Sequence, residues 1–110
     1  MKKKNRVKRS EEFQKIIHKG RKLINGQFVL YLMPKADEEA RIGISLSKKI
    51  GNAVERNKIK RQVRMMCQDL VDFNYATQDA VIIIRFSYKD NDYEANKKSL
   101  EKIFRKATII

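Results

Sequence analysis

The side chains of this sequence that could bind an anion are concentrated in one segment, from Lys48 to Arg64 (KKIGNAVERNKIKRQVR). Seven of its residues are Lys or Arg, and Glu55 is its only acidic residue. Ile59 and Val63 require a core, whereas the cations require an anion, and a helix can place the two sets on separate faces. A rigid, basic, half-buried helix of this kind is suited to binding a phosphate backbone.

A helix over 53–72 would gather a strip of polar side chains on one side. At about 100° per residue, the following residues fall within a narrow arc: Asn57, Lys60, Arg61, Arg64 and Gln68. A guanidinium can bridge two phosphate oxygens, and an amide can both accept and donate hydrogen bonds. An ordinary solvated charged face is the alternative, but acidic partners at helical spacing are nearly absent.

The composition favours a polyanionic partner. The chain has 26 Lys and Arg against 13 Asp and Glu, a net charge of +13 on 110 residues, which suits RNA, DNA or an acidic membrane surface. No apolar run approaches the roughly 18 residues of a membrane-spanning helix, so no membrane partner is expected. Cys67 is the only cysteine, which excludes an intramolecular disulfide and favours a reducing, cytoplasmic location.

Catalytic chemistry by the protein alone is not evident. A nuclease needs clustered carboxylates or a paired acid and base. Asp90 and Asp92 are a close pair, but a turn with Asp92 as the N-cap of the next helix explains them. His18 is the sole histidine and lies near a helix end. We therefore expect no catalytic residue, no metal site and no cofactor bound by the protein itself.

The pattern along the chain predicts an α+β fold in one domain over 1–110, with helices packed on one sheet. Ser10 is the expected N-cap of the first helix, and residues 1–9 form a basic segment that would be extended or mobile by itself. The helices are expected over 10–19, 53–72 and 93–106, and the strands over 27–33, 41–47 and 80–86. Two or three strands are expected before the long helix. A helix separates the last two strands, so these strands can run parallel.

The strand over 41–47 has one apolar face and one face of small residues, Gly43, Ser45 and Ser47. The small face leaves room for something to lie on the sheet. The turn expected at Asn25-Gly26 precedes the first strand.

Residues 50–64 resemble the signature of the bacterial ribonuclease P protein subunit, with its Arg-Asn-Arg-type core as Arg56, Asn57 and Arg61. Four other blocks are also similar, in order: the basic start with Glu11-Glu12-Phe13, and segments 27–31, 42–49 and 99–106. The resemblance therefore extends over nearly the whole chain.

The resemblance implies a four-stranded sheet packed with three helices in the order α-β-β-β-α-β-α, similar to the second domain of ribosomal protein S5. It implies a subunit of the endoribonuclease that removes the 5′ leader of precursor tRNA, with hydrolysis carried out by the RNA subunit. The implied partners are the ribonuclease P RNA and precursor tRNA, without an obligate protein partner. Mg²⁺ would enter the holoenzyme through the RNA.

Two binding surfaces follow from the resemblance. The catalytic RNA would contact Arg56, Asn57, Lys58 and Arg61. The single-stranded leader would contact Phe13, Ile17, Tyr31, Ser45, Ser47, Lys60 and Arg64, in a cleft between the sheet and the helices. Single strands bind by stacking on aromatic rings while cations follow the phosphates. Ile17 stands where the family often has an aromatic ring, and Phe13 and Tyr31 could also be ordinary core residues.

Two other function classes fit some of these features. A ribosomal or general RNA-binding protein without a processing role would have the same charge and element order. A DNA-binding regulator would need a recognition helix that reads base edges, and the basic helix has few residues other than phosphate ligands.

Overall fold

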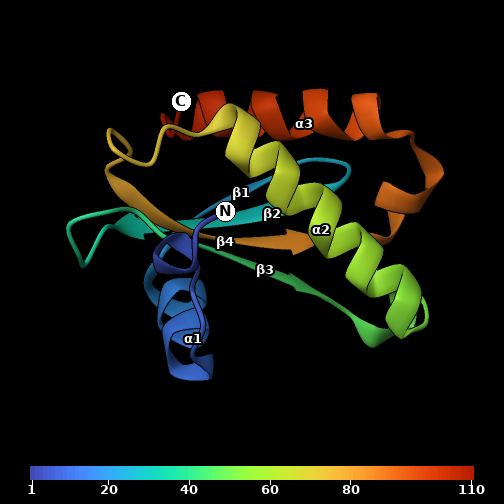
Figure 1. Cartoon of the computed structure of the whole chain (residues 1–110), viewed down its shortest axis with the longest axis horizontal. Helices are drawn as coiled ribbons and strands as arrows, with labels where there is room; N and C mark the ends of the chain where they lie inside the picture. Colours follow the sequence, from blue (N-terminus) through green and yellow to red (C-terminus); the bar gives the residue numbers. More distant parts are fainter.

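The computed structural model describes all residues from 1 to 110 and contains three α-helices and one four-stranded sheet (Figure 1). The helices are α1 (Ser10–Lys19), α2 (Ala53–Leu70) and α3 (Tyr93–Lys106). The strands are β1 (Arg21–Ile24), β2 (Phe28–Pro34), β3 (Ile42–Leu46) and β4 (Gln78–Ile84). Short 3-10 helices span Lys3–Asn5, Lys48–Ile50 and Phe86–Asp90. The expected α+β class and the order α-β-β-β-α-β-α are confirmed.

The strand order in the sheet is β1-β2-β4-β3. β2 is antiparallel to both of its neighbours, and β3 is parallel to β4, as the helix between these two strands predicts. β4 is central, and its residues Ala80, Val81 and Ile82 have no exposed surface. This agrees with the continuous apolar run in the sequence, which is typical of a strand covered on both faces.

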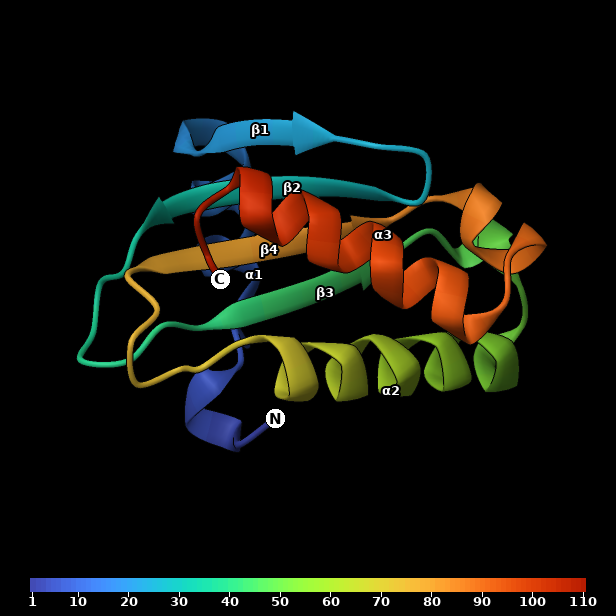
Figure 2. The same ribbon diagram turned by 90° about the horizontal axis from the view of Figure 1, so that it is seen from above.

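The two faces of the sheet are covered differently (Figures 1 and 2). α2 and α3 cover one face, which we call the closed face. Its core is built mainly from the following buried residues: Phe28, Leu30, Leu32, Ile42, Ala80, Ile82, Ile59, Val63, Met66, Leu100, Ile103 and Phe104. The ring of Phe28 meets that of Tyr88 edge-on, with centroids 5.9 Å apart. This continuous apolar layer is the main source of stability.

α1 lies on the opposite face, which we call the α1 face. The hydrophobic cluster on this face has only three buried members, Val7, Ile16 and Val81. Several apolar side chains pack against these three but remain partly exposed: Phe13, Ile17, Tyr31, Met33 and Ile83. This cluster is small because a ten-residue helix is the main cover of this face.

Capping residues set the start of the long helices. Asn52 and Glu55 form a capping box at the start of α2, in which the Asn52 side chain accepts from the Glu55 N–H at 2.9 Å. Asp92 accepts from the Ala95 N–H at 2.8 Å, which confirms its expected role as the N-cap of α3. The expectation for Ser10 is wrong by one residue: α1 begins at Ser10, and Arg9 is the N-cap without a side-chain hydrogen bond.

The turn expected at Asn25-Gly26 is confirmed and joins β1 to β2, but the residue pattern did not indicate β1 itself. The side chain of Asn25 makes this turn, accepting from the N–H groups of Gln27 at 3.2 Å and Phe28 at 2.9 Å. β1 is short and carries two cations, so it lacks the alternation expected of a strand. Pairing with β2, and not local propensity, makes it a strand.

The N-terminal segment packs against the strand β3. Asn5 is buried and donates from its side chain to the Ala40 carbonyl at 3.1 Å. The Val7 N–H donates to the Ile42 carbonyl at 3.2 Å. Arg6 lies between Asn5 and Val7 in the chain, so these contacts place it beside β3, at the edge of the sheet. None of the helices is long and apolar enough to cross a membrane.

Candidate nucleic-acid interface

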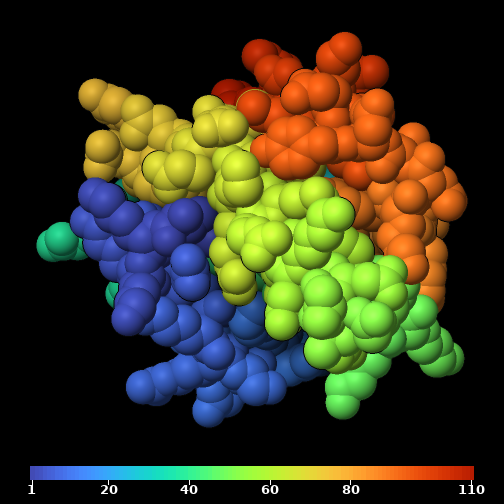
Figure 3. Space-filling view, turned by 45° about the vertical axis from the view of Figure 1, so that its right-hand side comes forward, coloured from blue at the N-terminus to red at the C-terminus, as the bar shows by residue number.

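In the face seen in Figure 3, the green to yellow surface of α2 lies between the blue N-terminal region and the orange region of α3. The residues of α2 that are predicted contacts differ in exposure. The inner side of α2 is buried at Ile59, Val63, Met66 and Cys67. Asn57 and Arg61 are exposed on the outer side, one turn apart. A third set is half-buried along the border between them: Arg56, Lys60 and Arg64. Successive residues of this border lie four apart, so their side chains follow one edge of the helix.

Arg56 and Lys58, the other two residues expected to touch the catalytic RNA, therefore do not lie on the same side of α2 as Asn57 and Arg61. Arg56 lies on the same border as Lys60 and Arg64, which were expected to touch the leader. Lys58 is exposed on the other side of α2, where it lines a shallow pocket of about 320 Å³ with Tyr88 and Lys89.

The predicted leader residues of the sheet lie on the α1 face. Strand pairing aligns Lys22, Tyr31, Val81 and Gly43 in one row across the four strands. The ring of Tyr31 is half-buried, and the Lys22 ammonium lies 5.8 Å from its centroid, within cation–π range. Tyr31 is therefore part of a packed cluster and still has ring surface to offer a ligand.

The sheet surface at Gly43, which the small side chains were expected to leave open for a ligand, is covered. A Cβ atom at Gly43 would lie 2.6 Å from Cε1 of Phe13 and 3.0 Å from Cβ of Val7. The missing side chain therefore makes room for the Phe13 ring, which covers this part of the sheet. Ser45 is one row further along and remains partly exposed beside Ile83, its partner on β4.

Ser47 lies at the end of the sheet. It follows β3, is exposed, and accepts from the Lys49 N–H at 3.1 Å. It lines an open pocket of about 490 Å³ together with Ile83 and Phe86. Ile17 lies at the other side of the α1 face, in the cluster around Val81.

Arg64 and Arg6 form a pair of cations without an acidic partner. Burial and the neighbouring positive charge of Arg6 lower the pKa of Arg64. Arg6 donates to the Met1 carbonyl at 3.1 Å, and its buried Nε has no hydrogen-bond partner. Neither guanidinium group forms an ion pair within the fold, so both are suited to an anion, which a planar guanidinium fork can bind.

Arg6 and Lys22 are the two residues of this region that sequence reasoning missed. Arg6 was one of several cations in a segment without predicted structure, and Lys22 lies on the strand that the pattern did not indicate. No local signal distinguishes either residue from other exposed cations.

The buried Nε of Arg41 also has no hydrogen-bond partner, but Arg41 differs from Arg6 and Arg64 in having acidic neighbours. Arg41 forms an ion pair with Glu12 and lies 3.6 Å from Asp79 and 3.8 Å from Asp37. None of the seven ion pairs in the structure involves the predicted contact residues: Arg56, Lys58, Lys60, Arg61 and Arg64. These cations are therefore not used to hold the fold together.

The remaining reactive side chains are structural or isolated. Cys67 is fully buried, and burial raises the pKa of its thiol to about 12, as befits a small core residue. No group of three or more His, Cys, Asp or Glu side chains is placed to hold a metal ion. His18 is exposed near the end of α1.

Comparisons with known proteins agree on one family. The model of the ribonuclease P family matches residues 1–108. The chain is 46% identical to the ribonuclease P protein component of Bacillus velezensis, over 99% of this chain and 94% of that protein. It is 43% identical to that of Bacillus pumilus, over 99% and 92% of the two chains.

Solved structures show the same fold. The RNase P protein of Staphylococcus aureus superposes with a TM-score of 0.86 at 36% identity, covering 96% of both chains. The RNase P protein from Thermotoga maritima gives a TM-score of 0.78 at 25% identity, over 92% of this chain and 96% of that one. The chain therefore belongs to the family of ribonuclease P protein components, which are the protein partners of the ribonuclease P RNA in a tRNA-processing endoribonuclease.

Proposed function

We propose that this protein binds the ribonuclease P RNA through α2 and holds the 5′ leader of precursor tRNA on the α1 face, in the cytoplasm. The observation that carries the proposal is the position of the unpaired cations. They border a sheet face whose aromatic side chains are only half-buried. Family membership decides against the alternative of a ribosomal protein without a processing role.

The contact with the catalytic RNA uses the outer side of α2. Asn57 and Arg61 are exposed at adjacent turns of a helix whose first turn is fixed by a capping box. A rigid helix keeps the spacing of these donors constant, which favours a phosphate backbone of defined shape. Arg56 would reach the same RNA from the border of the helix, and Lys58 would extend the contact toward Tyr88.

The leader contact uses the α1 face. Phe13 and Tyr31 offer partly exposed rings, on which bases of any sequence can stack. Ile17 offers apolar surface without a ring, and Ser45 and Ser47 can donate hydrogen bonds. Lys60 and Arg64, with Arg6 beside Arg64, would hold the phosphates of the same strand.

Hydrolysis of the phosphodiester is assigned to the RNA subunit in this proposal. The protein offers no cluster of carboxylates on the predicted surfaces, and Mg²⁺ would be bound through the RNA. The contribution of the protein is then binding energy for the leader, which mature tRNA cannot use. This predicts tighter binding of precursor than of mature tRNA.

Reconstitution tests the proposal. The protein is combined with a cognate ribonuclease P RNA, and the affinities for precursor and mature tRNA are measured with and without the protein. We expect the protein to raise the affinity for the precursor selectively. Specific cleavage of the precursor at the mature 5′ end by protein and Mg²⁺ alone would contradict the assignment of catalysis to the RNA.

A further inference from the structure

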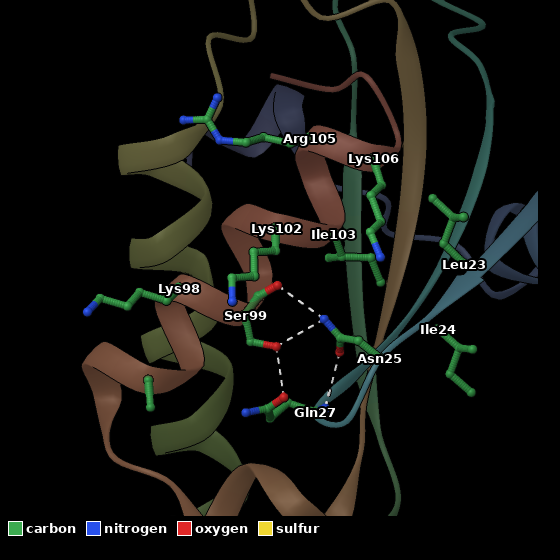
Figure 4. A pocket seen from close by; sticks show the side chains of 11 residues that line it. Leu23, Ile24, Asn25, Gln27, Lys98, Ser99, Lys102, Ile103, Arg105 and Lys106 are labelled. Atoms are coloured by element: carbon green, nitrogen blue, oxygen red, sulfur yellow. Dashed lines mark hydrogen bonds between the residues drawn. The ribbon is translucent and has the colours of Figure 1, made fainter.

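A basic groove lies between β1 and α3, on the other side of the sheet edge from Tyr31 (Figure 4). Its volume is about 660 Å³, and its lining contains four cations and no acidic residue. Leu23, Ile24 and Ile103 supply apolar surface, and the side chain of Ile24 is 58% exposed. The mixture of apolar surface and cations matches the needs of a single nucleic acid strand.

The lysines of this groove have no structural use. On α3, Lys97 pairs with Asp69 at 3.0 Å and Arg105 pairs with Glu101 at 3.1 Å. Lys98, Lys102 and Lys106 form no ion pair. They lie four residues apart, on one side of the helix. Successive lysines are displaced by about 6 Å along the axis. Like charges at this spacing repel one another, and an anion in the groove would relieve the repulsion.

A hydrogen-bond network holds the groove in shape. Asn25 donates to the Ser99 hydroxyl at 3.0 Å and to the Ser99 carbonyl at 3.1 Å. The Ser99 hydroxyl donates to the side-chain oxygen of Gln27 at 2.8 Å. Figure 4 shows these three residues joining the hairpin to α3. The groove is therefore preformed and does not need to close around a ligand.

The groove lies on the side of α3 that faces β1 and the predicted leader contact, whereas the predicted contact with the catalytic RNA lies on α2. β1 is an edge strand, and Lys22 on β1 lies opposite Tyr31 on β2. A strand lying on Tyr31 needs to cross only β1, about 5 Å wide, to reach the groove. α2 instead borders β3, at the opposite edge of the sheet (Figure 2).

We propose that this groove binds the distal part of the precursor leader, namely the nucleotides farther from the cleavage site than those that stack on Tyr31. Lys102 and Lys106 hold phosphates, Lys98 contributes from the outer rim, and Ile24 contacts a base. The inference rests on the proposed function, because it extends the leader path from the α1 face around β1.

Leader length provides the test. The reconstituted holoenzyme is titrated with precursors whose leaders range from about two to about sixteen nucleotides, each nucleotide adding about 3.4 Å when stacked. The variant carries Lys102→Gln and Lys106→Gln, and the control carries Lys2→Gln and Lys3→Gln, with the same loss of charge at exposed positions. We expect wild type and control to bind long leaders more tightly than short ones.

The groove variant should lose about tenfold in affinity for long leaders and nothing for the shortest ones, with a salt slope lower by about 2. Equal length dependence in the groove variant and wild type would overturn the groove proposal and leave the proposed function standing. Tyr31→Ala, measured in parallel, should weaken binding at every leader length. Unchanged leader binding in Tyr31→Ala would instead contradict the proposed function.

Cross-linking identifies the occupant. Ile24→Cys can be labelled with a photoactivatable thiol reagent while buried Cys67 stays unreactive, and Tyr75→Cys, at a position 81% exposed, serves as the control. We expect Ile24→Cys to cross-link to distal leader nucleotides and the control to give no leader cross-link. A cross-link from Ile24→Cys to the ribonuclease P RNA, or to a second copy of the protein, would overturn the assignment to the leader.

Discussion

Both faces of the sheet carry apolar side chains, but these are buried on the closed face and partly exposed on the α1 face. In β2, Phe28, Leu30 and Leu32 point to the closed face and are at most 2% exposed. Val29, Tyr31 and Met33 alternate with them and point to the α1 face, where all three are half-exposed. An apolar side chain is thus a core residue on one face and available surface on the other. The difference is set by how many helices cover each face.

The cations show the same contrast. Arg41 is surrounded by the carboxylates of Glu12, Asp37 and Asp79, so its charge is satisfied within the fold. Arg64 has another cation, Arg6, as its charged neighbour. The positive charge of Arg6 and Arg64 is therefore not neutralised within the fold and is available to a ligand.

The largest expected effect concerns the closed face. Phe104→Ala removes a fully buried ring and should lower the free energy of unfolding by about 3–5 kcal/mol. Phe86→Ala, at a position 56% exposed, should change it by less than about 0.5 kcal/mol. Urea unfolding measures both. The folded fraction of Phe104→Ala should keep the preference for precursor over mature tRNA, and loss of that preference would show that the faces are not separable.

The second prediction concerns the contact between α1 and the sheet. Gly43→Ala places a methyl group 2.6 Å from the Phe13 ring and should cost about 1–3 kcal/mol of stability through overpacking. It should also displace Phe13 and weaken leader binding. Gly26→Ala is the control, because a Cβ there meets nothing within 4 Å. Equal stability of the two variants in urea would contradict the close contact of Phe13 with Gly43.

Most of the fold could be predicted from the sequence because its signals are local. The helical spacing of α2 and the continuous apolar run of β4 are such signals, and both elements are present within a few residues of the expected bounds. β1 could not be found in this way, since its four residues become a strand only by pairing with β2. The residue pattern left two or three strands before α2 open, and the family resemblance implied three.

The site was predictable in its residue types but not in its packing. Alternation along β3 correctly places Ser45 on the side of the sheet opposite the main core. It could not show that Phe13, thirty residues earlier in the chain, covers Gly43. The pairing of Arg6 with Arg64 likewise depends on the N-terminal segment lying along β3, which is a tertiary contact without a sequence pattern.

The third prediction concerns the aromatic surface of the α1 face. Tyr31→Ala should reduce the preference of the holoenzyme for precursor over mature tRNA by about 1–3 kcal/mol, because stacking on a leader nucleotide is lost. Tyr31→Phe keeps the ring and should keep the preference. Affinities for both tRNAs and the melting temperature are measured for each variant. Equal losses for both tRNAs, in step with the melting temperature, would identify Tyr31 as a core residue only.

The smallest expected effect concerns single cations on α2. Arg61 is exposed and forms no ion pair, so Arg61→Ala should leave the melting temperature unchanged. Assembly with the ribonuclease P RNA should weaken a few-fold, and the salt slope of binding should fall by about 1 for the lost phosphate contact. Lys2→Ala removes one charge from an exposed position outside α2 and should leave the slope nearly unchanged.

Arg56→Ala completes this test, because Arg56 is half-buried on the border of α2. Its loss should lower the salt slope as Arg61→Ala does and also reduce stability slightly, since the half-buried side chain loses packing as well as charge. If Arg56 instead contacts the leader, as proposed for Lys60 and Arg64, Arg56→Ala will weaken precursor binding and leave assembly with the ribonuclease P RNA unchanged. Unchanged assembly affinity and salt slope in both variants would remove α2 as the contact with the catalytic RNA, and the division of labour between α2 and the α1 face would then be wrong.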